Sequence, residues 1–372
     1  MMDDFKIQVV KAGIPLSTTK PPQKWTGQWS FQVYVKAKSN GKTGWGEALP
    51  AALNSVDAYS AMIDGYLKII GDADHYDVRG IWEKMSRSSF SGGYGVTSGA
   101  MSAIDIALWD LKARELGVPL SSMLGSNSGK ARRYASLSRY NRPEETLQIV
   151  RNLVDDGYTL VKLHQSDTDT LETMKLIRKE LGYDIKIAAD MNCAFRFNHA
   201  KEFVQKMAKL EPYWIEEPLW PHDDYDGLAK LNRIAPIAGG ENEFSINQFH
   251  TMLQKESLSY YQPDVAKIGG ITPLLDLVSL FKAYNSGIAF HSRPHNGWIS
   301  TMASACVAVG TCIDAWIETP PNGIPDQYFE HQVTMNKDIV STNGSGISIS
   351  LKEPVPEPGD FTPLIFHGET KK

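Results

Sequence analysis

Acidic residues end several short apolar segments in the second half of the chain, and their types suit metal-assisted chemistry. Asp190 lies in IKIAADMN, Glu216 in YWIEEP and Glu241 in IAPIAGGEN. If these segments are neighbouring strands, the three carboxylates converge and repel one another. A hard divalent cation relieves such repulsion. An oxygen-only ligand set favours Mg²⁺, with Mn²⁺ as an alternative.

Titratable groups flank this predicted metal site on two sides. Lys162 and His164 lie two residues apart in one segment, so both side chains point the same way. Asp264 and His291 end two later segments, and an aspartate bonded to a histidine fixes its tautomer and raises its basicity. Glu318 ends the last segment of this kind. A substrate held at the metal would have a candidate acid–base group on each face.

Eight strand-like segments carry these residues, and helix-length amphipathic stretches separate most of them. Eight strand–helix units predict a (β/α)8 TIM-type barrel, whose active site lies where the carboxyl ends of the strands meet. We expect this barrel to occupy residues 128–340. The eight segments are RRYASLSRY, TLVKLHQ, IKIAADMN, YWIEEP, IAPIAGGEN, SYYQPDV, GIAFHS and DAWIETP.

The preceding residues, 1–127, predict a separate α+β domain. FKIQVVKAGIPL and WSFQVYVKAKS alternate as strands do, and SGAMSAIDIALWDLKARELG has the spacing of an amphipathic helix. A long loop from Ser17 to Gly27 separates the two predicted strands. Residues 341–372 do not fit a ninth strand–helix unit, and we expect them to return to the first domain.

Composition excludes several classes of protein. The 372 residues are 22% charged and 42% hydrophobic, which is typical of a globular enzyme and not of a disordered chain. A net charge of −5 argues against a nucleic-acid partner. The start MMDDFKIQVV is no signal peptide, and no apolar run predicts a membrane span, so we expect a cytoplasmic protein. Cys193, Cys306 and Cys312 form no CxxC pair and are expected to be buried thiols.

The motifs resemble the enolase superfamily, mandelate racemase subgroup, over essentially the whole chain. The resemblance is carried by SAIDIALWDLKARELGVPLSSMLG, VKLH, ADMN, WIEEP, GGENE, QPDVAKIGGIT and WIE. It implies a barrel with an N-terminal α+β capping domain, a Mg²⁺ site, and a homo-oligomer between dimer and octamer. Two capping-domain loops, one roughly from Leu16 to Trp29 and another near Leu49 to Ser55, would select the substrate.

The resemblance also implies roles for individual residues. Asp190, Glu216 and Glu241 match the metal ligands. Lys162 matches the first lysine of a Lys-x-Lys motif, whose second position here is His164.

The remaining catalytic positions are implied in the same way. Asp264 stands where a related subgroup carries a basic lysine, which points to a His–Asp dyad. Its histidine is either His291, at a strand end, or His295, four residues later, and we favour His291. Glu318 matches an acid that bonds a substrate carboxylate oxygen.

The chemistry implied is removal of the proton next to a carboxylate. Mg²⁺, Lys162 and a protonated Glu318 would stabilise the enediolate, and loss of the β-hydroxyl would give a 2-keto-3-deoxy acid. We therefore predict a dehydratase of a sugar acid, an aldonate or an aldarate. A racemase or epimerase of a 2-hydroxy acid is the alternative, and a catalytically idle binding protein a remote one. Candidate substrate contacts are Asn192, Lys267, His295 and Trp25.

Overall fold

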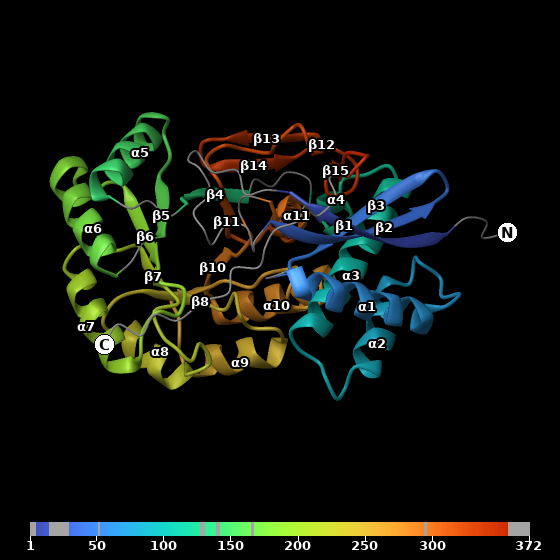
Figure 1. The fold of residues 1–372 in the computed structure, drawn as a ribbon, viewed down its shortest axis with the longest axis horizontal. Helices are drawn as coiled ribbons and strands as arrows, with labels where there is room; N and C mark the ends of the chain where they lie inside the picture. Colours follow the sequence, from blue (N-terminus) through green and yellow to red (C-terminus); the bar gives the residue numbers. More distant parts are fainter. Residues whose placement is uncertain are drawn as a thin grey trace.

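The computed structural model describes residues 5–14, 30–50, 53–126, 131–138, 142–164, 167–293 and 296–355. A three-stranded antiparallel sheet with its helices lies at one end, and a closed parallel barrel lies beside it (Figure 1). The predicted (β/α)8 barrel with an N-terminal α+β domain is confirmed. The predicted loop from Ser17 to Gly27, with Trp25, lies outside the described residues, as does His295.

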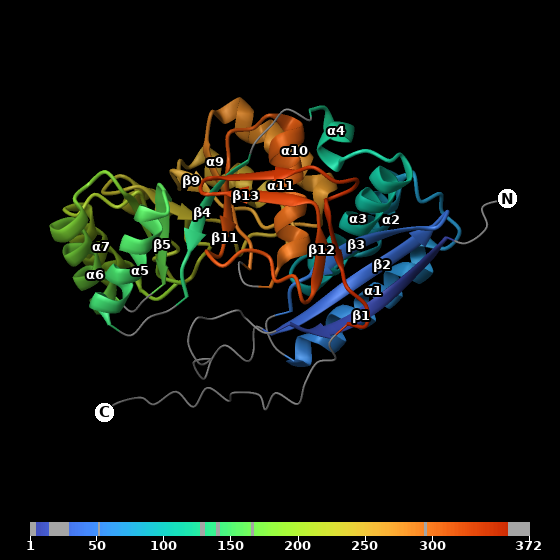
Figure 2. The same cartoon turned by 90° about the horizontal axis from the view of Figure 1, so that it is seen from above.

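The capping domain is a sheet covered by helices. Its strands pair in the order β1-β2-β3, and Figure 2 shows helices α1–α3 against one face of this sheet. The bounds are β1 (Lys6–Gly13), β2 (Phe31–Ser39), β3 (Lys42–Ala48), α1 (Leu53–Ile70), α2 (Val78–Ser88) and α3 (Val96–Glu115).

Helix α3 lies directly on β3 because two glycines leave room for its backbone. A Cβ atom at Gly44 would overlap the carbonyl oxygen of Ala107, and one at Gly46 would overlap that of Ala103. Glycine therefore serves here for close approach of two backbones. The contact buries α3 almost all round, which is why its sequence shows apolar residues on more than one face.

The barrel closes through the pairing of its first and last strands. Strands β4 to β11 are parallel neighbours in chain order, and β11 also pairs with β4. The strands are β4 (Ala131–Ser136), β5 (Leu160–His164), β6 (Lys186–Asp190), β7 (Trp214–Glu216), β8 (Ile237–Gly239), β9 (Tyr260–Tyr261), β10 (Gly287–Phe290) and β11 (Trp316–Thr319). The helices are α5 (Pro143–Asp155), α6 (Asp167–Leu181), α7 (Phe197–Ala208), α8 (Tyr225–Asn232), α9 (Ile246–Gln254), α10 (Ile271–Tyr284) and α11 (Trp298–Thr311).

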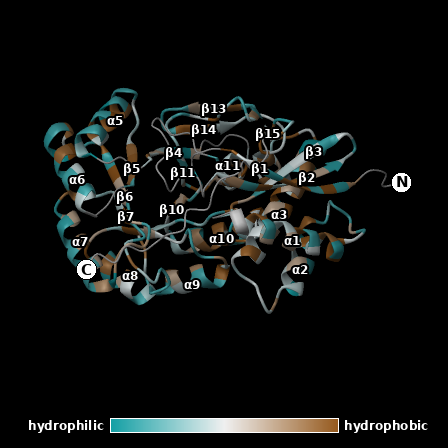
Figure 3. Ribbon diagram, in the orientation of Figure 1, coloured by the Kyte–Doolittle hydropathy of each residue, from teal (hydrophilic) through white to brown (hydrophobic). Residues whose placement is uncertain are grey.

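Side chains fill the interior of the barrel, so it is a packed core and not a pore. Tyr134, Trp214 and Trp316 are the large members of this inner cluster, and small alanines such as Ala188 and Ala238 make room for them. Outside the barrel, Figure 3 shows hydrophilic and hydrophobic residues alternating along α5, α6 and α7. This is expected of helices with one face on the barrel and one in solvent.

The C-terminal strands extend from the barrel toward the capping domain. Strand β14 pairs antiparallel with β4, and beyond it residues near β15 contact α3 and β2. Arg114 Nη2 donates to the carbonyl oxygen of Ile349 at 2.7 Å, and Lys36 pairs with Glu353. The remaining elements are α4 (Leu120–Leu124), β12 (Phe329–His331), β13 (Val333–Asn336), β14 (Ile339–Thr342) and β15 (Ile349–Leu351).

The cysteine prediction holds only in part. All three thiols are free, but only Cys306 is buried, Cys193 is half-buried and Cys312 is exposed. Cys312 ends α11 in the left-handed conformation, at a position that faces solvent. Among the described residues, no helix is both long and apolar enough to span a membrane.

Candidate active site at the carboxyl ends of the barrel strands

Three carboxylates meet at the carboxyl ends of adjacent strands. Asp190 and Glu216 are the last residues of β6 and β7 and are partners in the strand register. Glu241 follows the end of β8 by two residues. One oxygen from each lies within 4.8 Å of the other two. This set of oxygen donors has the composition that Mg²⁺ and Mn²⁺ prefer.

The charge at this cluster is incompletely balanced by the described side chains. Burial and the nearby charge of Asp190 raise the pKa of Glu216 well above its usual range, although Lys162 opposes the shift. A buried carboxylate whose ionisation is opposed by its neighbours gains most from a bound cation. The residues present therefore fit a divalent metal ion.

Lys162 is the central cation of the site, and it is completely buried on β5. Its Nζ lies 2.6 Å from Glu216 Oε1, 2.7 Å from Glu318 Oε1 and 3.4 Å from Asp190 Oδ2. Burial alone would lower the pKa of Lys162, but these carboxylates raise it well above its usual range. Lys162 is thus a permanent positive charge between two predicted metal ligands and Glu318.

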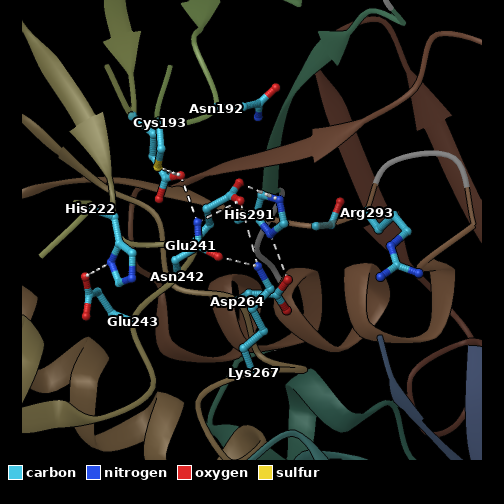
Figure 4. A network of polar contacts seen from close by, with 12 residues as sticks. Asn192, Cys193, His222, Glu241, Asn242, Glu243, Asp264, Lys267, His291 and Arg293 are labelled. Atoms are coloured by element: carbon cyan, nitrogen blue, oxygen red, sulfur yellow. Dashed lines mark hydrogen bonds and ion pairs between the residues drawn. The ribbon is translucent and has the colours of Figure 1, made fainter. Parts of the chain in front are cut away.

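His291 and Asp264 form a hydrogen-bonded pair (Figure 4). His291 directly follows β10, and its Nδ1 lies 2.7 Å from Asp264 Oδ2. Asp264 is fully buried, and its other oxygen accepts from the backbone N–H of Ala266 at 2.8 Å. The imidazole Nε2 lies 2.8 Å from Glu241 Oε2. Burial opposes protonation, yet the charge of Glu241 and the bond to Asp264 raise the pKa of His291 to about 10.

His164 has both ring nitrogens engaged. Its Nδ1 lies 2.7 Å from the carbonyl oxygen of Leu137, and its Nε2 lies 3.0 Å from Asp190 Oδ2. Lys162 and His164 thus reach the same Asp190 oxygen, as their spacing along β5 predicts. The ring is placed to orient Asp190, and each of its two nitrogens already contacts an oxygen atom.

Glu318 departs from the expectation that it is protonated. Burial favours the neutral acid, but Lys162 outweighs burial, so the pKa of Glu318 is lowered. Its Oε2 also accepts from the backbone N–H of Ser292 at 3.3 Å. The ammonium of Lys162, 2.7 Å away, stabilises the ionised carboxylate of Glu318 more than the neutral acid. Glu318 is therefore expected to be ionised and not protonated.

Of the four candidate substrate contacts, Asn192 and Lys267 lie within the described residues. The backbone N–H of Asn192 donates to Asp190 Oδ1 at 2.8 Å, and in Figure 4 its side chain lies apart from His291. Lys267 Nζ lies 3.8 Å from Glu241 Oε1. Lys267 therefore borders the carboxylate cluster, while the other two candidates, Trp25 and His295, stay predictions.

A second layer of polar contacts around the carboxylates was not foreseen. Cys193 Sγ and Asn242 Nδ2 both donate to Glu217 Oε2, at 3.1 and 2.8 Å. Burial and the charge of Glu241 raise the pKa of Glu217 to about 8. The position of Glu217 directly after Glu216 was the one sign in the sequence that Glu217 lies at the site. The spacing of the strand ends does not show which loops meet there, so the contacts with Cys193 and Asn242 could not be predicted.

A histidine–glutamate contact on the neighbouring loops was missed as well. His222 Nδ1 lies 3.1 Å from Glu243 Oε1 (Figure 4). Tyr225 and Gln248 donate to Glu243 Oε2. Glu243 is buried and contacts side chains of the loop after β7, so it joins that loop to the loop after β8, which carries Glu241.

Two family matches cover most of the chain. Residues 15–125 match the mandelate racemase / muconate lactonizing enzyme N-terminal domain, and residues 145–355 match the enolase C-terminal domain-like family. The chain belongs to the enolase superfamily. The resemblance drawn from the motifs is thereby confirmed.

Curated relatives of this enolase-superfamily chain are named as dehydratases, which are hydro-lyases. The arabinonate dehydratase of Saccharolobus solfataricus is 27% identical over 334 residues, covering 85% of this chain and 87% of the relative. The D-galactonate dehydratase of Cronobacter sakazakii is 28% identical over 291 residues, covering 74% and 73%. The D-gluconate dehydratase of Thermoproteus tenax is 26% identical over 355 residues, covering 90% and 71%.

Solved enolase-superfamily structures superpose over nearly the whole chain. The 3,6-anhydro-D-galactonate cycloisomerase from Zobellia galactanivorans has a TM-score of 0.81 and 25% identity, covering 94% of this chain and 97% of its own. A racemase from Streptomyces coelicolor A3(2) with bound magnesium has a TM-score of 0.81 and 23% identity, covering 93% and 96%. The second comparison supports the fold alone.

Proposed function

We propose that this protein is a divalent-metal-dependent dehydratase of a sugar acid, either an aldonate or an aldarate. The observation that carries the proposal is the His291–Asp264 pair, held beside three converging carboxylates. The curated relatives named as arabinonate, galactonate and gluconate dehydratases support the same reaction class. The substrates in these names differ from one another, so the particular sugar acid is left open.

Asp190, Glu216 and Glu241 would hold the metal ion. When bound, a divalent ion supplies positive charge that offsets the negative charge developing on the substrate carboxylate. Lys162 adds a fixed, fully buried ammonium next to Glu216 and Glu318. The same residues therefore orient the substrate carboxylate and lower the barrier to loss of the neighbouring proton.

His291 carries the proton in this proposal. Asp264 occupies Nδ1, so Nε2 is the nitrogen that faces substrate. Because Nε2 lies 2.8 Å from Glu241 Oε2, a bound substrate has to displace that contact before the ring accepts a proton. The charge of Glu241 is a main cause of the raised pKa of His291, so loss of this contact favours the neutral ring, and the displaced proton leaves to solvent. The neutral ring then takes the α-proton as the C–H electron pair moves toward the carboxylate.

The same imidazole completes the elimination. Once protonated, His291 gives its proton to the departing β-hydroxyl, the C–O bond breaks, and water leaves. The enol that remains tautomerises to a 2-keto-3-deoxy acid. A racemase needs a second group to return a proton from the opposite face. The second position of the Lys-x-Lys motif holds His164 in place of a lysine, which favours dehydration.

A panel of aldonates and aldarates, incubated with the purified protein and Mg²⁺, tests the proposal. Formation of a 2-keto-3-deoxy acid is followed by a colour assay. We expect conversion of at least one acid, with loss of activity in EDTA and in Asp264→Asn. If no acid in a stereochemically complete panel of five- and six-carbon acids is converted, dehydration is not the function.

A further inference from the structure

Arg293 connects the loop that carries His291 to the capping domain. Its Nη1 donates to the carbonyl oxygen of Phe31 at 3.1 Å, and its Nη2 donates to that of Pro50 at 2.9 Å. In Figure 4 the guanidinium lies apart from the carboxylate cluster, on the side of the capping-domain strands. Arg293 therefore bridges the two domains two residues after the predicted base.

Asn296, on the same loop, makes a matching contact. Its Nδ2 donates to the carbonyl oxygen of Ile14 at 2.9 Å, and the side chain is fully buried. The backbone of Ile14 is also held by the side chain of Gln32, which accepts from its N–H at 3.0 Å. One barrel loop thus contacts three capping-domain carbonyl groups, those of Ile14, Phe31 and Pro50.

These carbonyl groups lie next to the capping-domain segments expected to select the substrate. Ile14 immediately precedes segment 15–29, and Phe31 lies two residues after it. Pro50 immediately precedes residues 51–52. Residues on both sides of the first segment, and the residue before the second, are therefore bonded to side chains that follow His291 in the sequence.

The other member of the dyad is tied to the capping domain in the same manner. In the loop after Asp264, the N–H of Gly269 donates to Ser102 Oγ at 2.9 Å, and its carbonyl accepts from Trp82 Nε1 at 2.9 Å. Both loops that hold the dyad are thus bonded to the capping domain. The position of the capping domain and the position of the dyad are set together.

Arginine suits this place because its planar guanidinium binds two acceptors at once. Glu47 lies near enough to interact with the Arg293 charge, and its Oε2 accepts from the backbone N–H of Ser300, farther along the same barrel segment. A lysine would keep the charge but would lose the two-pronged geometry.

We propose that Arg293 and Asn296 are positioning residues that hold the edge of the capping domain in register with His291, so that a substrate is presented correctly to the imidazole. Neither side chain is assigned a contact with the reacting atoms. The kinetic part of the proposal rests on the dehydratase function, whereas the anchoring part does not.

Steady-state kinetics of Arg293→Met test the functional part. We expect KM for the sugar acid to rise about tenfold while kcat stays within about threefold, because binding across the domain boundary is weakened and the base is left intact. In Arg293→Lys, KM should lie between the values of the native protein and Arg293→Met. A native KM in Arg293→Lys would show that the positive charge suffices without the two hydrogen bonds, and would overturn the proposed anchoring. Asn296→Ala should shift KM in the same direction.

Arg79→Met is the matched control. Arg79 also bridges the two domains, to Asp276 at 3.4 Å, but both side chains are exposed by about half. An exposed pair contributes little, and this one lies away from the dyad, so KM should not change. An equal rise of KM in both variants would show a general loosening of the domain boundary and would overturn the proposal.

Hydrogen–deuterium exchange of the full chain gives a readout that needs no substrate. In Arg293→Met, and in Arg293→Lys if the first variant does not fold, amides of residues 30–34 and 46–49 should exchange faster than in the native protein and in Arg79→Met. Unchanged exchange there would overturn the anchoring role. If no acid is converted by the native protein, the dehydratase function fails, and the exchange experiment still decides the anchoring.

Discussion

At the scale of residues, the chemistry depends on a proton carrier and on a cluster of like charges. Asp264 holds His291 through Nδ1, and burial of the aspartate keeps water from competing for that bond. The strand-end spacing was enough to predict this pair, because adjacent strands of a parallel barrel end at the same face. The engagement of His164 by Leu137 was not predictable, because it depends on a loop carbonyl.

The first prediction concerns His291. Replacement by asparagine keeps a polar side chain of similar size but removes the proton carrier, so kcat should fall by about 10²–10⁴-fold. Thermal unfolding and metal binding should change little. His250→Asn, on α9 and away from the site, is the control and should retain activity. Native-like turnover by the His291 variant would shift the assignment to His295.

The second prediction concerns the carboxylate cluster. Because Asp190, Glu216 and Glu241 repel one another, Mg²⁺ should stabilise the folded protein, by about 2.7 kcal/mol at a hundred times its Kd. Thermal unfolding with Mg²⁺ and with EDTA measures the difference. Glu241→Gln should abolish most of this stabilisation. Identical Tm values in the two conditions would argue against a metal site at these residues.

At the scale of elements, the capping helices and the barrel helices share buried contacts. The carboxylate of Asp105 on α3 accepts from the backbone N–H of Thr272 at 2.9 Å and from its hydroxyl at 2.6 Å. It thereby caps the first turn of α10, whose own N-cap residue is Gly270 and provides no side chain. A residue of the capping domain thus caps a helix of the barrel. The spacing of apolar residues along either helix cannot predict such a contact.

The third prediction is a pH dependence of this contact. Burial raises the pKa of Asp105 to about 7, above its value of about 3.9 in unfolded chains. The folded state therefore binds the proton more tightly. The stability from Asp105 is fully present below about pH 4 and is lost as the pH rises toward 7.

Asp105→Asn should remove that part of the pH dependence, which amounts to at most about 4 kcal/mol. The amide keeps one acceptor oxygen for Thr272, so the contact itself can persist. Urea unfolding of both proteins at pH 5 and at pH 8 measures the effect. A variant whose stability falls between these pH values as steeply as that of the native protein would contradict the account.

The fourth prediction concerns the contact between β3 and α3. Gly46→Ala would place a methyl group into the carbonyl of Ala103, so the free energy of unfolding should fall by about 3 kcal/mol or more. Gly65→Ala, inside α1 with open space around its Cβ position, is the control and should stabilise by about 0.5–1 kcal/mol. Equal effects of the two substitutions would contradict the close approach of α3.

At the scale of the whole molecule, the barrel was predictable because eight strand–helix units leave few other topologies. The N-terminal sheet and the long helix α3 were predictable from alternation and from helical spacing. Contacts that join the domains, such as those of Arg293 and Asp105, were not, since they depend on how two finished units fit together. The domain boundaries, the homo-oligomer and the cytoplasmic location stay predictions.

The most direct test of the central claim is proton NMR of the reaction in D₂O with Mg²⁺ and a sugar acid converted in the panel. If His291 removes the α-proton and then helps the β-hydroxyl leave, the product is a 2-keto-3-deoxy acid with one deuterium at C3. The Asp264→Asn protein should give neither product nor exchange. Recovery of the acid with deuterium at its α-carbon, and no keto acid, would show a racemase or epimerase and would contradict the proposed dehydration.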